Sequence, residues 1–293
     1  MKNIPRRPTL LLAKIQSFTK FRDVVKCIQL VSLASLKKLK NKLATRHVAL
    51  SAIKDLFYVE INSNLEASYY ENKRVSILVI TTEKSCSGSI NNRTNRSVLK
   101  FYTKVRGFIK FANFLFIGKK GLVLIRRRFK TNLSLNLFRE LEKDANCLLI
   151  SYLVVNDIHK NLFDVCVIFF NKFESGFNSK IAMYQIDSFD IFLLKIFSTD
   201  RAPNRLLDLL VEKNIGDDFF FLELYYFSFC LIVLDALEEN NYSELASRAQ
   251  AMESAVTNTT DRITFLTLVY NKTRQALITN EIIEVLNASS AIK

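Results

Sequence analysis

The positions of glycine and proline constrain this chain more than any other feature, because both residues interrupt helices. All six glycines lie between residues 88 and 216, and the prolines are Pro5, Pro8 and Pro203. Residues 9–87 and 217–293 therefore contain neither residue type. Since glycine costs about 1 and proline about 3 kcal/mol inside a helix, both ends of the chain can form very long helices.

The spacing of apolar residues indicates that the two end segments, 1–60 and 210–293, pair with each other. Apolar or small side chains recur in both at alternating intervals of three and four residues, which predicts the seam of a coiled coil. A bundle of shorter helices is the alternative, but turn residues would normally separate its helices. The predicted seam residues are Phe21, Val24, Ile28 and Val31 in the first helix and Met252, Val256, Ile263, Leu266 and Tyr270 in the second.

The middle of the chain, residues 70–205, has a different pattern. Short apolar runs alternate there with mixed polar segments, which is typical of a mainly parallel sheet covered by helices. We therefore predict an α/β fold, in which a long antiparallel coiled coil of the N- and C-terminal helices is combined with a central Rossmann-like α/β domain. The expected strands are 75–81, 122–125, 147–155 and 165–170, and the expected helical segments are 93–110 and 133–143.

The net charge of +14 is concentrated near the N-terminus. Residues 1–47 hold twelve Lys or Arg against Asp23 alone, a net charge of +11. Such a segment is expected to meet an acidic partner: a nucleic acid, an anionic lipid or an acidic protein surface. A basic helical nucleic-acid-binding protein is one interpretation. The apolar positions of the segment keep a helix-pairing period, however, and its aromatic residues form no stacking platform, which favours a protein partner.

The sequence contains no recognisable catalytic, metal-binding or cofactor-binding motif. The segment 82–92, which follows the first predicted strand, has one glycine instead of the G-x-G-x-x-G pattern and lacks a Walker lysine. The five cysteines are scattered without a CxxC pair, and His47 and His159 have no partner at a useful spacing. We expect no cofactor, no metal and no independent enzymatic activity.

Two apolar stretches raise the question of membrane targeting or insertion. Leu10–Ala13 follows basic residues but is too short for the apolar core of a signal peptide, so we expect no targeting peptide. Phe219–Leu234 contains Glu223 and is shorter than the ~20 residues that a membrane-spanning helix needs. We expect the second stretch to be a buried helix.

Residues 243–292, SELASRAQAMESAVTNTTDRITFLTLVYNKTRQALITNEIIEVLNASSAI, resemble a known family. The segment is similar to the C-terminal helix of the γ subunits of F-type ATP synthases, which opens S-E-x-x-A-R-x-x-A-M-x-x-A-T-x-N and continues L-x-L-x-x-N-K-x-R-Q-x-x-I-T-x-E. The matching residues are Glu244, Arg248, Ala251, Met252, Ala255, Asn258, Leu266, Asn271, Lys272, Arg274, Gln275, Ile278, Thr279, Glu281 and Glu284.

Weaker similarities follow in the same order as in the family. Residues 26–38, KCIQLVSLASLKK, resemble K-A-M-K-M-V-A-A-S-K-L-R-K, and residues 82–91, TEKSCSGSIN, resemble S-D-R-G-L-C-G-x-x-N. Residues 167–187 are the part of the divergent middle that is similar to the family. The departures are Gln29 and Ser35 in place of lysines, Glu83 in place of an aspartate and Ser85 in place of a glycine.

The resemblance implies a subunit of the rotating central stalk, which couples proton-driven rotation of the membrane c-ring to ATP synthesis. It implies that the paired end helices rise into the α3β3 hexamer of α and β subunits. The α/β domain would then contact the c-ring and a small epsilon or delta stalk subunit, without spanning the membrane and without binding nucleic acid. The residues expected to contact β are Asn271, Lys272, Arg274, Gln275, Thr279, Lys37, Lys38, Arg93 and Arg96.

The expected location is the matrix side of the mitochondrial inner membrane. The divergent, Trp-free sequence is rich in Lys, Asn, Ile and Phe, which suits an organelle-encoded or processed mitochondrial subunit. The cytoplasmic side of a bacterial plasma membrane is the alternative.

Overall fold

A computed structural model describes residues 8–57, 59–60, 67–82, 86–128, 134–138, 147–175, 178–197 and 218–291. Two long helices begin and end this part of the chain: α1, Pro8–Phe57, and α7, Asp218–Ala291. The chain forms two compact units, which we call the shaft unit (Met1–Ala34 with Arg248–Lys293) and the foot unit (Ser35–Ser247). Both long helices therefore contribute to both units, whereas the sequence placed the domain boundaries near residues 60, 70, 205 and 210.

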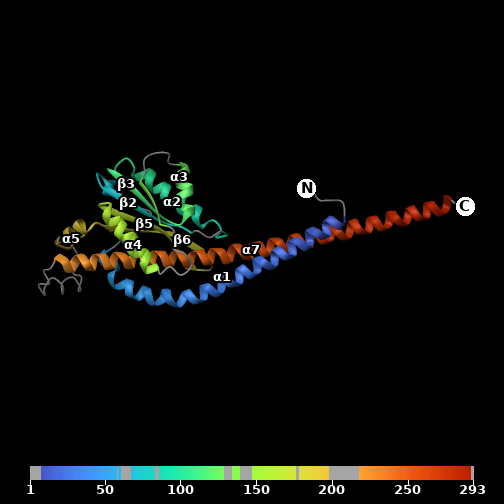
Figure 1. Ribbon diagram of the computed structural model, residues 1–293, viewed down its shortest axis with the longest axis horizontal. Helices are drawn as coiled ribbons and strands as arrows, with labels where there is room; N and C mark the ends of the chain where they lie inside the picture. Colours follow the sequence, from blue (N-terminus) through green and yellow to red (C-terminus); the bar gives the residue numbers. More distant parts are fainter. Residues whose placement is uncertain are drawn as a thin grey trace. The chain divides into compact units, whose positions relative to one another are not determined.

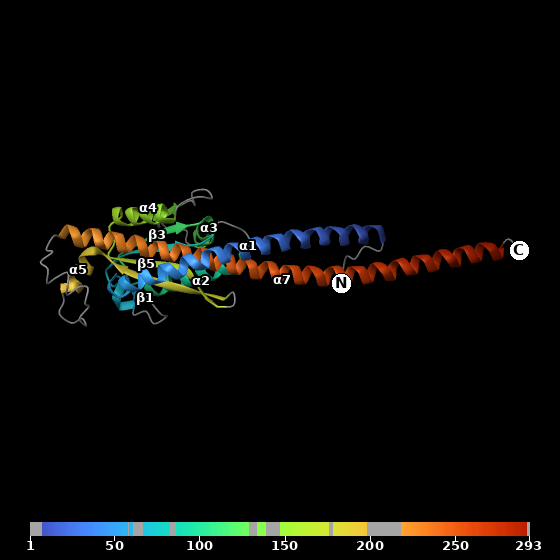
Figure 2. The same cartoon turned by 90° about the horizontal axis from the view of Figure 1, so that it is seen from below.

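In the shaft unit, α1 and α7 lie side by side and run antiparallel, as two perpendicular views show (Figure 1, Figure 2). Leu11, Val25 and Ser32 of α1 are buried, and they are separated by multiples of seven residues. In α7 the buried residues Met252, Thr259 and Leu266 also recur every seven residues. A seven-residue repeat on both helices is the pattern of a coiled coil, so the predicted fold class is confirmed for this unit.

The seam of α1 differs from the prediction. The expected residues Phe21, Val24, Ile28 and Val31 are 38–67% exposed, and the buried face lies one residue further along the helix. Consecutive helical residues point about 100° apart, so two stripes with the same spacing can lie on different faces of one helix. The periodicity was present in the sequence, but the assignment of these four residues to the seam is wrong.

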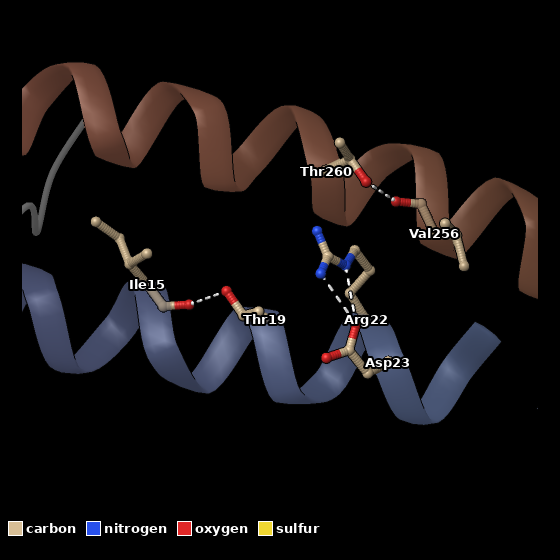
Figure 3. Close-up of polar contacts among 6 residues, drawn as sticks. All are labelled: Ile15, Thr19, Arg22, Asp23, Val256 and Thr260. Atoms are coloured by element: carbon tan, nitrogen blue, oxygen red, sulfur yellow. Dashed lines mark hydrogen bonds and ion pairs between the residues drawn. The ribbon is translucent and has the colours of Figure 1, made fainter. Parts of the chain in front are cut away.

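Polar side chains occupy part of the true α1 seam. Arg22 extends into the space between the helices, toward the segment of α7 that carries Val256 and Thr260 (Figure 3). Its guanidinium pairs with its neighbour Asp23 at 3.0 Å. On the α7 side, Met252 and Leu266 of the predicted seam are buried. The other predicted seam residues of α7 are half-buried: Val256, Ile263 and Tyr270.

The foot unit contains a six-stranded sheet with the order β1-β6-β5-β2-β3-β4. The pairs β2–β3, β2–β5 and β3–β4 are parallel, and β5–β6 and β1–β6 are antiparallel. The strands are β1 Val59–Glu60, β2 Arg74–Ile80, β3 Phe111–Ile117, β4 Ser134–Phe138, β5 Val165–Ser175 and β6 Asn178–Asp187. The other elements are η1 Ala67–Tyr70, α2 Ile90–Val105, α3 Lys119–Arg128, α4 Cys147–Lys160 and α5 Phe189–Phe197.

Two of the four predicted strands are helices. Residues 122–125 lie in α3 and residues 147–155 in α4, because a short apolar run fits a buried strand and a half-buried helix equally well. The burial of Ile150, Val154 and Ile158 in α4 has a helical period. Conversely, the predicted helical segment 133–143 contains strand β4, and its remaining residues lie outside the described part of the chain.

Both faces of the sheet are covered by apolar side chains. Alternate residues of β5 point to opposite faces: Val167 belongs to the cluster that includes α2, and Ile168 to the cluster that includes α4 and α7. The α7 side chains in the second cluster include Tyr225, Phe229 and Val233. By length and composition α7 could cross a membrane, but 56% of its most apolar window is buried within the protein. In the stretch 219–234, Phe221, Tyr225 and Phe229 are buried whereas Phe219 and Phe227 are exposed, so the expected buried helix is buried on one face.

Where β3 leads into α3, the backbone lies very close to Thr81 at the end of β2. Gly118 has a φ of +89°, and a Cβ at this position would lie 2.4 Å from the carbonyl oxygen of Thr81. A Cβ on Gly121 would lie 2.8 Å from the Thr81 side chain. The Thr81 hydroxyl accepts a hydrogen bond from the Gly121 amide at 3.1 Å, which fixes the start of α3 against the end of β2.

We expect Gly118→Ala to lower the free energy of unfolding by about 1–3 kcal/mol, since it combines an unfavourable φ with a clash against backbone. Gly107→Ala is the matched control, because a Cβ there meets no atom within 4 Å. Urea unfolding of the dilute full-length chain, followed by circular dichroism, measures both. Equal stability of the two variants would contradict this description of the β3–α3 junction.

Candidate functional site

The C-terminal part of α7 is a helix that the rest of the described chain does not cover. Every residue from Arg274 to Ser290 is exposed, and in both views this part extends past the N-terminal end of α1 (Figure 1, Figure 2). Its exposed apolar residues are Leu277, Ile278, Ile282, Ile283, Val285 and Leu286. Since large exposed apolar surfaces mark interaction sites, this tip is the first candidate for contact with other proteins.

A polar band directly precedes the apolar tip. It consists of the five predicted contact residues Asn271, Lys272, Arg274, Gln275 and Thr279, all of which are exposed. The Thr279 hydroxyl donates to the Gln275 carbonyl oxygen at 2.9 Å, a bond within the helix. Among the described residues, Lys272 and Arg274 make no ion pair or side-chain hydrogen bond, so both cations are available to a partner.

The other predicted contact residues lie on two different helices. Lys37 and Lys38 are exposed on α1, and Arg93 and Arg96 are exposed on α2. Arg93 is already engaged within the foot unit, because its guanidinium donates to the carbonyl and hydroxyl oxygens of Ser179 at 2.9 and 2.7 Å. No described contact joins these four residues to one another or to the polar band.

A second functional feature, which the sequence analysis missed, is a buried polar strip on α7. Its buried residues are Asp235, Glu239, Asn240, Ser243 and Glu244, and the half-buried Ser247 follows them on the same helix. Asn240 and Ser243 are 1% and 0% exposed. The strip faces the sheet of the foot unit, where each of its members meets a polar partner or a backbone group.

Asn171, which lies in β5 just past the part of the strand that pairs with β2, is the centre of these contacts. Its side-chain nitrogen donates to the Asn240 oxygen and to the Thr94 hydroxyl, both at 2.9 Å. Its carbonyl oxygen accepts the hydroxyl of Ser243 at 2.9 Å. Strand β5 and helices α2 and α7 thus meet in one hydrogen-bonded cluster. Directional bonds of this kind hold a helix at one register, which a purely apolar interface does not specify.

The strip continues to the loop that follows β2. The Ser247 hydroxyl donates to the Ser87 carbonyl oxygen at 2.8 Å, and the Ser87 hydroxyl donates to Glu244 at 3.4 Å. A Cβ on Gly88 would lie 3.1 Å from the Ser247 hydroxyl oxygen, so loop and helix are in close contact. In open α/β sheets, the carboxyl ends of strands such as β2 and β5 are where ligands bind. Here α7 itself contacts that edge.

Asn240→Ala should lower the free energy of unfolding by about 1–3 kcal/mol, because the buried Asn171 amide loses a partner that water cannot replace. Asn241→Ala is the control, since the Asn241 side chain makes only a 4.0 Å contact with the sulfur of Cys147. Urea unfolding of the two full-length variants gives the difference. If Asn241→Ala lowers the free energy of unfolding as much as Asn240→Ala does, the proposed role of the strip is wrong.

His159, at the end of α4, lies in an aromatic environment. Its ring centroid is 4.2 Å from that of Tyr226 and 5.3 Å from that of Phe163. Among the described residues its Nε2 atom has no hydrogen-bond partner. Burial lowers the pKa of His159 to about 4, because the imidazolium would lose its hydration. The residue is therefore a neutral packing group between α4 and α7.

The low pKa makes the stability of the foot unit depend on pH. Below the ordinary histidine pKa of about 6.5, unfolded chains take up a proton at His159 and folded chains do not, so stability falls as the pH drops from about 6.5 toward 4. We expect His159→Phe and His159→Gln to reduce this dependence of the free energy of unfolding on pH. The difference between the urea midpoints at pH 7 and pH 5 measures this dependence. If both variants show the same difference as the parent chain, His159 is not the group responsible.

Comparison with known proteins gives matches along almost the whole chain. A family model described as ATP synthase matches residues 10–292. The ATP synthase gamma chain of Bdellovibrio bacteriovorus is 27% identical over 290 residues, which cover 96% of this chain and 97% of that protein. The ATP synthase gamma chain of Ehrlichia chaffeensis is 29% identical over 289 residues, with 96% and 98% covered.

Mitochondrial proteins match as well. The mitochondrial ATP synthase subunit gamma of Trypanosoma brucei brucei is 24% identical over 285 residues, with 96% of this chain and 90% of that protein covered. A chain in the cryo-EM structure of the Euglena gracilis mitochondrial ATP synthase, OSCP/F1/c-ring in rotational state 3, has the same fold. The TM-score is 0.82 at 22% identity, with 97% of this chain and 94% of that chain covered.

Proposed function

The chain belongs to the ATP synthase gamma-subunit family, and from this membership we infer that it is the central-stalk subunit of an ATP synthase. The observation that carries the inference is the match over residues 10–292, which includes both long helices and the α/β domain between them. As a rotor, the subunit couples rotation driven by proton flow to ATP synthesis. Bacterial and mitochondrial gamma chains are both similar to this chain, and the ATP synthase is membrane-associated.

We propose that the exposed tip of α7 turns inside the hexamer formed by the α and β subunits. Between Leu277 and Leu286, large apolar residues cover about two-thirds of the helix circumference, and Asn280 and Glu284 lie on the remaining side. Such a surface is unfavourable in water but suits an apolar sleeve, in which a helix can rotate with few directional bonds. The foot unit would contact the c-ring and a small epsilon or delta subunit, which makes the chain peripheral to the membrane.

The polar band is proposed to contact a β subunit at certain rotor angles. Rotation can change nucleotide affinity only if each angle binds the β conformations unequally. Arg274 is suited to this task, because its exposed guanidinium can form two parallel hydrogen bonds with one carboxylate and breaks both when the angle changes. Asn271, Lys272, Gln275 and Thr279 supply further donors and acceptors beside it.

The basic residues of α1 and α2 are proposed to face acidic segments of β. Lys37, Lys38 and Arg96 are exposed, and each such contact is worth well under about 1 kcal/mol because water and salt screen it. Arg93 contributes less than its exposure suggests, since Ser179 already accepts two of its hydrogen bonds. Weak contacts suit a rotor, which must leave each β subunit in turn.

We further propose that the subunit is not itself catalytic and that nucleotide chemistry occurs on its partners. The mitochondrial inner membrane, on the matrix side, is the proposed location. The cytoplasmic side of a bacterial plasma membrane is the alternative, since gamma chains from both sources match this chain.

Arg274→Ala should reduce ATP synthesis by the assembled complex by about tenfold, because a charged hydrogen-bonded contact is worth about 1.5–3 kcal/mol. The fold should not change, since Arg274 is exposed and makes no contact with the described chain. Proton-driven ATP synthesis in vesicles, normalised to the amount of assembled enzyme, measures the effect.

Arg274→Lys separates charge from geometry. The lysine keeps the positive charge but cannot pair with a carboxylate through two parallel bonds, so we expect synthesis between that of the parent and that of Arg274→Ala. If Arg274→Ala synthesises ATP at the parent rate, the proposed contact at this position is wrong.

A further inference from the structure

One edge of strand β5 is completed by a helix instead of by another strand. β2 pairs with β5 only from Val165 to Phe169, whereas β6 pairs with β5 as far as Ser175. Among the described strands, β6 alone therefore pairs with residues 170–175. The opposite edge of this part of β5 would leave backbone amide and carbonyl groups without partners, which is unfavourable inside a protein.

Side chains of α7 supply the missing partners. The Asn171 amide donates to the side-chain oxygen of Asn240 at 3.4 Å, and the Asn171 carbonyl oxygen accepts a hydrogen bond from the Ser243 hydroxyl at 2.9 Å. Two residues further along β5, the Phe173 amide donates to the Glu239 carboxylate at 3.3 Å. Alternate residues of a strand direct their backbone groups to the same edge. α7 thus takes the place of a neighbouring strand at this edge.

These bonds constrain the rotation of α7 about its own axis. Consecutive helical residues point about 100° apart, so Glu239, Asn240 and Ser243 all lie within one sector of about 100°. A rotation of the helix in place would therefore break the three bonds together. The contacts of Tyr225 and Phe229 in the preceding turns are apolar, and apolar attraction is not directional. The polar side chains thus specify the angle of the helix more narrowly than the apolar ones do.

The bonded part of β5 is also joined to α2. The Asn171 side-chain nitrogen donates to the Asn240 oxygen and to the Thr94 hydroxyl, both at 2.9 Å. Asn171, Thr94 and Ser243 are completely buried, so water cannot replace a bond that is lost. The angle of α7 is therefore fixed relative to the sheet and to the helix on its other face.

We propose that Glu239, Asn240 and Ser243 are positioning residues that fix the rotational angle of α7 relative to the sheet of the foot unit. The proposal rests on the proposed rotor function, because a subunit that carries torque needs a fixed angle between its α/β domain and its helix. A torque applied to the α/β domain acts on α7 through these three side chains, and the helix follows with little elastic lag.

Angular fluctuations of the paused rotor test the proposal. The assembled complex is immobilised through its catalytic ring, and a bead is attached to the exposed end of α2 through Lys104→Cys in a background without the exposed residues Cys27 and Cys86. During pauses at low ATP concentration, the angular variance of the bead is inversely related to the torsional stiffness between bead and ring. We expect Ser243→Ala and Asn240→Leu each to raise this variance by about twofold, because each removes a directional bond to β5.

Two controls separate the positioning role from a general weakening of the foot unit. Asn241→Leu makes the same substitution at the adjacent residue, whose side chain makes only a 4.0 Å contact with the sulfur of Cys147. Gly118→Ala is expected to destabilise the foot unit at the β3–α3 junction, where the nearest atoms belong to Thr81. Both controls should keep the angular variance of the parent.

The outcomes distinguish this proposal from the proposed function. If the parent bead does not rotate at saturating ATP, the rotor function is wrong and the positioning role fails with it. If the parent rotates but Ser243→Ala and Asn240→Leu keep the parent variance, only the positioning role is wrong. An equal rise in either control also overturns it, because that result reports general softening. Ser243→Ala removes a single oxygen atom and keeps the test decisive if Asn240→Leu does not assemble.

Discussion

The structure depends on one uninterrupted helix, α7, which packs against the foot unit in its first part and is exposed in its last part. α7 runs for 74 residues without a glycine or a proline, about 110 Å at 1.5 Å per residue. Between residues 235 and 244, five polar side chains are buried within the foot unit. Near its end, apolar side chains are exposed. Because the backbone hydrogen bonds are continuous between these regions, a torque applied to the foot is carried along the same helix that ends in the tip.

The buried polar strip explains why residues 235–247 of α7 are polar on a face that packs against the foot unit, where a packed helix would usually be apolar. Asn240 and Ser243 complete the hydrogen bonds of Asn171, and Ser247 bonds the loop after β2. The edge of the sheet that serves as a ligand site in Rossmann-like enzymes is here contacted by the helix. The α/β domain thus anchors α7 through directional hydrogen bonds.

Much of this architecture could be predicted from the sequence. The absence of glycine and proline from both ends predicted the two long helices, and the family motif located the polar band at 271–279. Periodicity alone could not choose between two stripes one residue apart on α1, so Phe21 and its companions were assigned to the wrong face. Short apolar runs could not separate strand from helix in α4. The strip was missed because polar residues at a helical period usually indicate a solvent-exposed face, and only the fold reveals what covers them.

We propose that the foot unit turns together with the tip of α7, and that only the tip lies inside a ring of other subunits. The most direct measurement is single-molecule rotation of the assembled complex, immobilised through its catalytic ring, with a bead attached to the foot through Lys104→Cys in a background without the exposed residues Cys27 and Cys86. We predict that ATP drives unidirectional rotation of the bead. A bead that stays fixed relative to the ring while the same complex hydrolyses ATP would contradict the account.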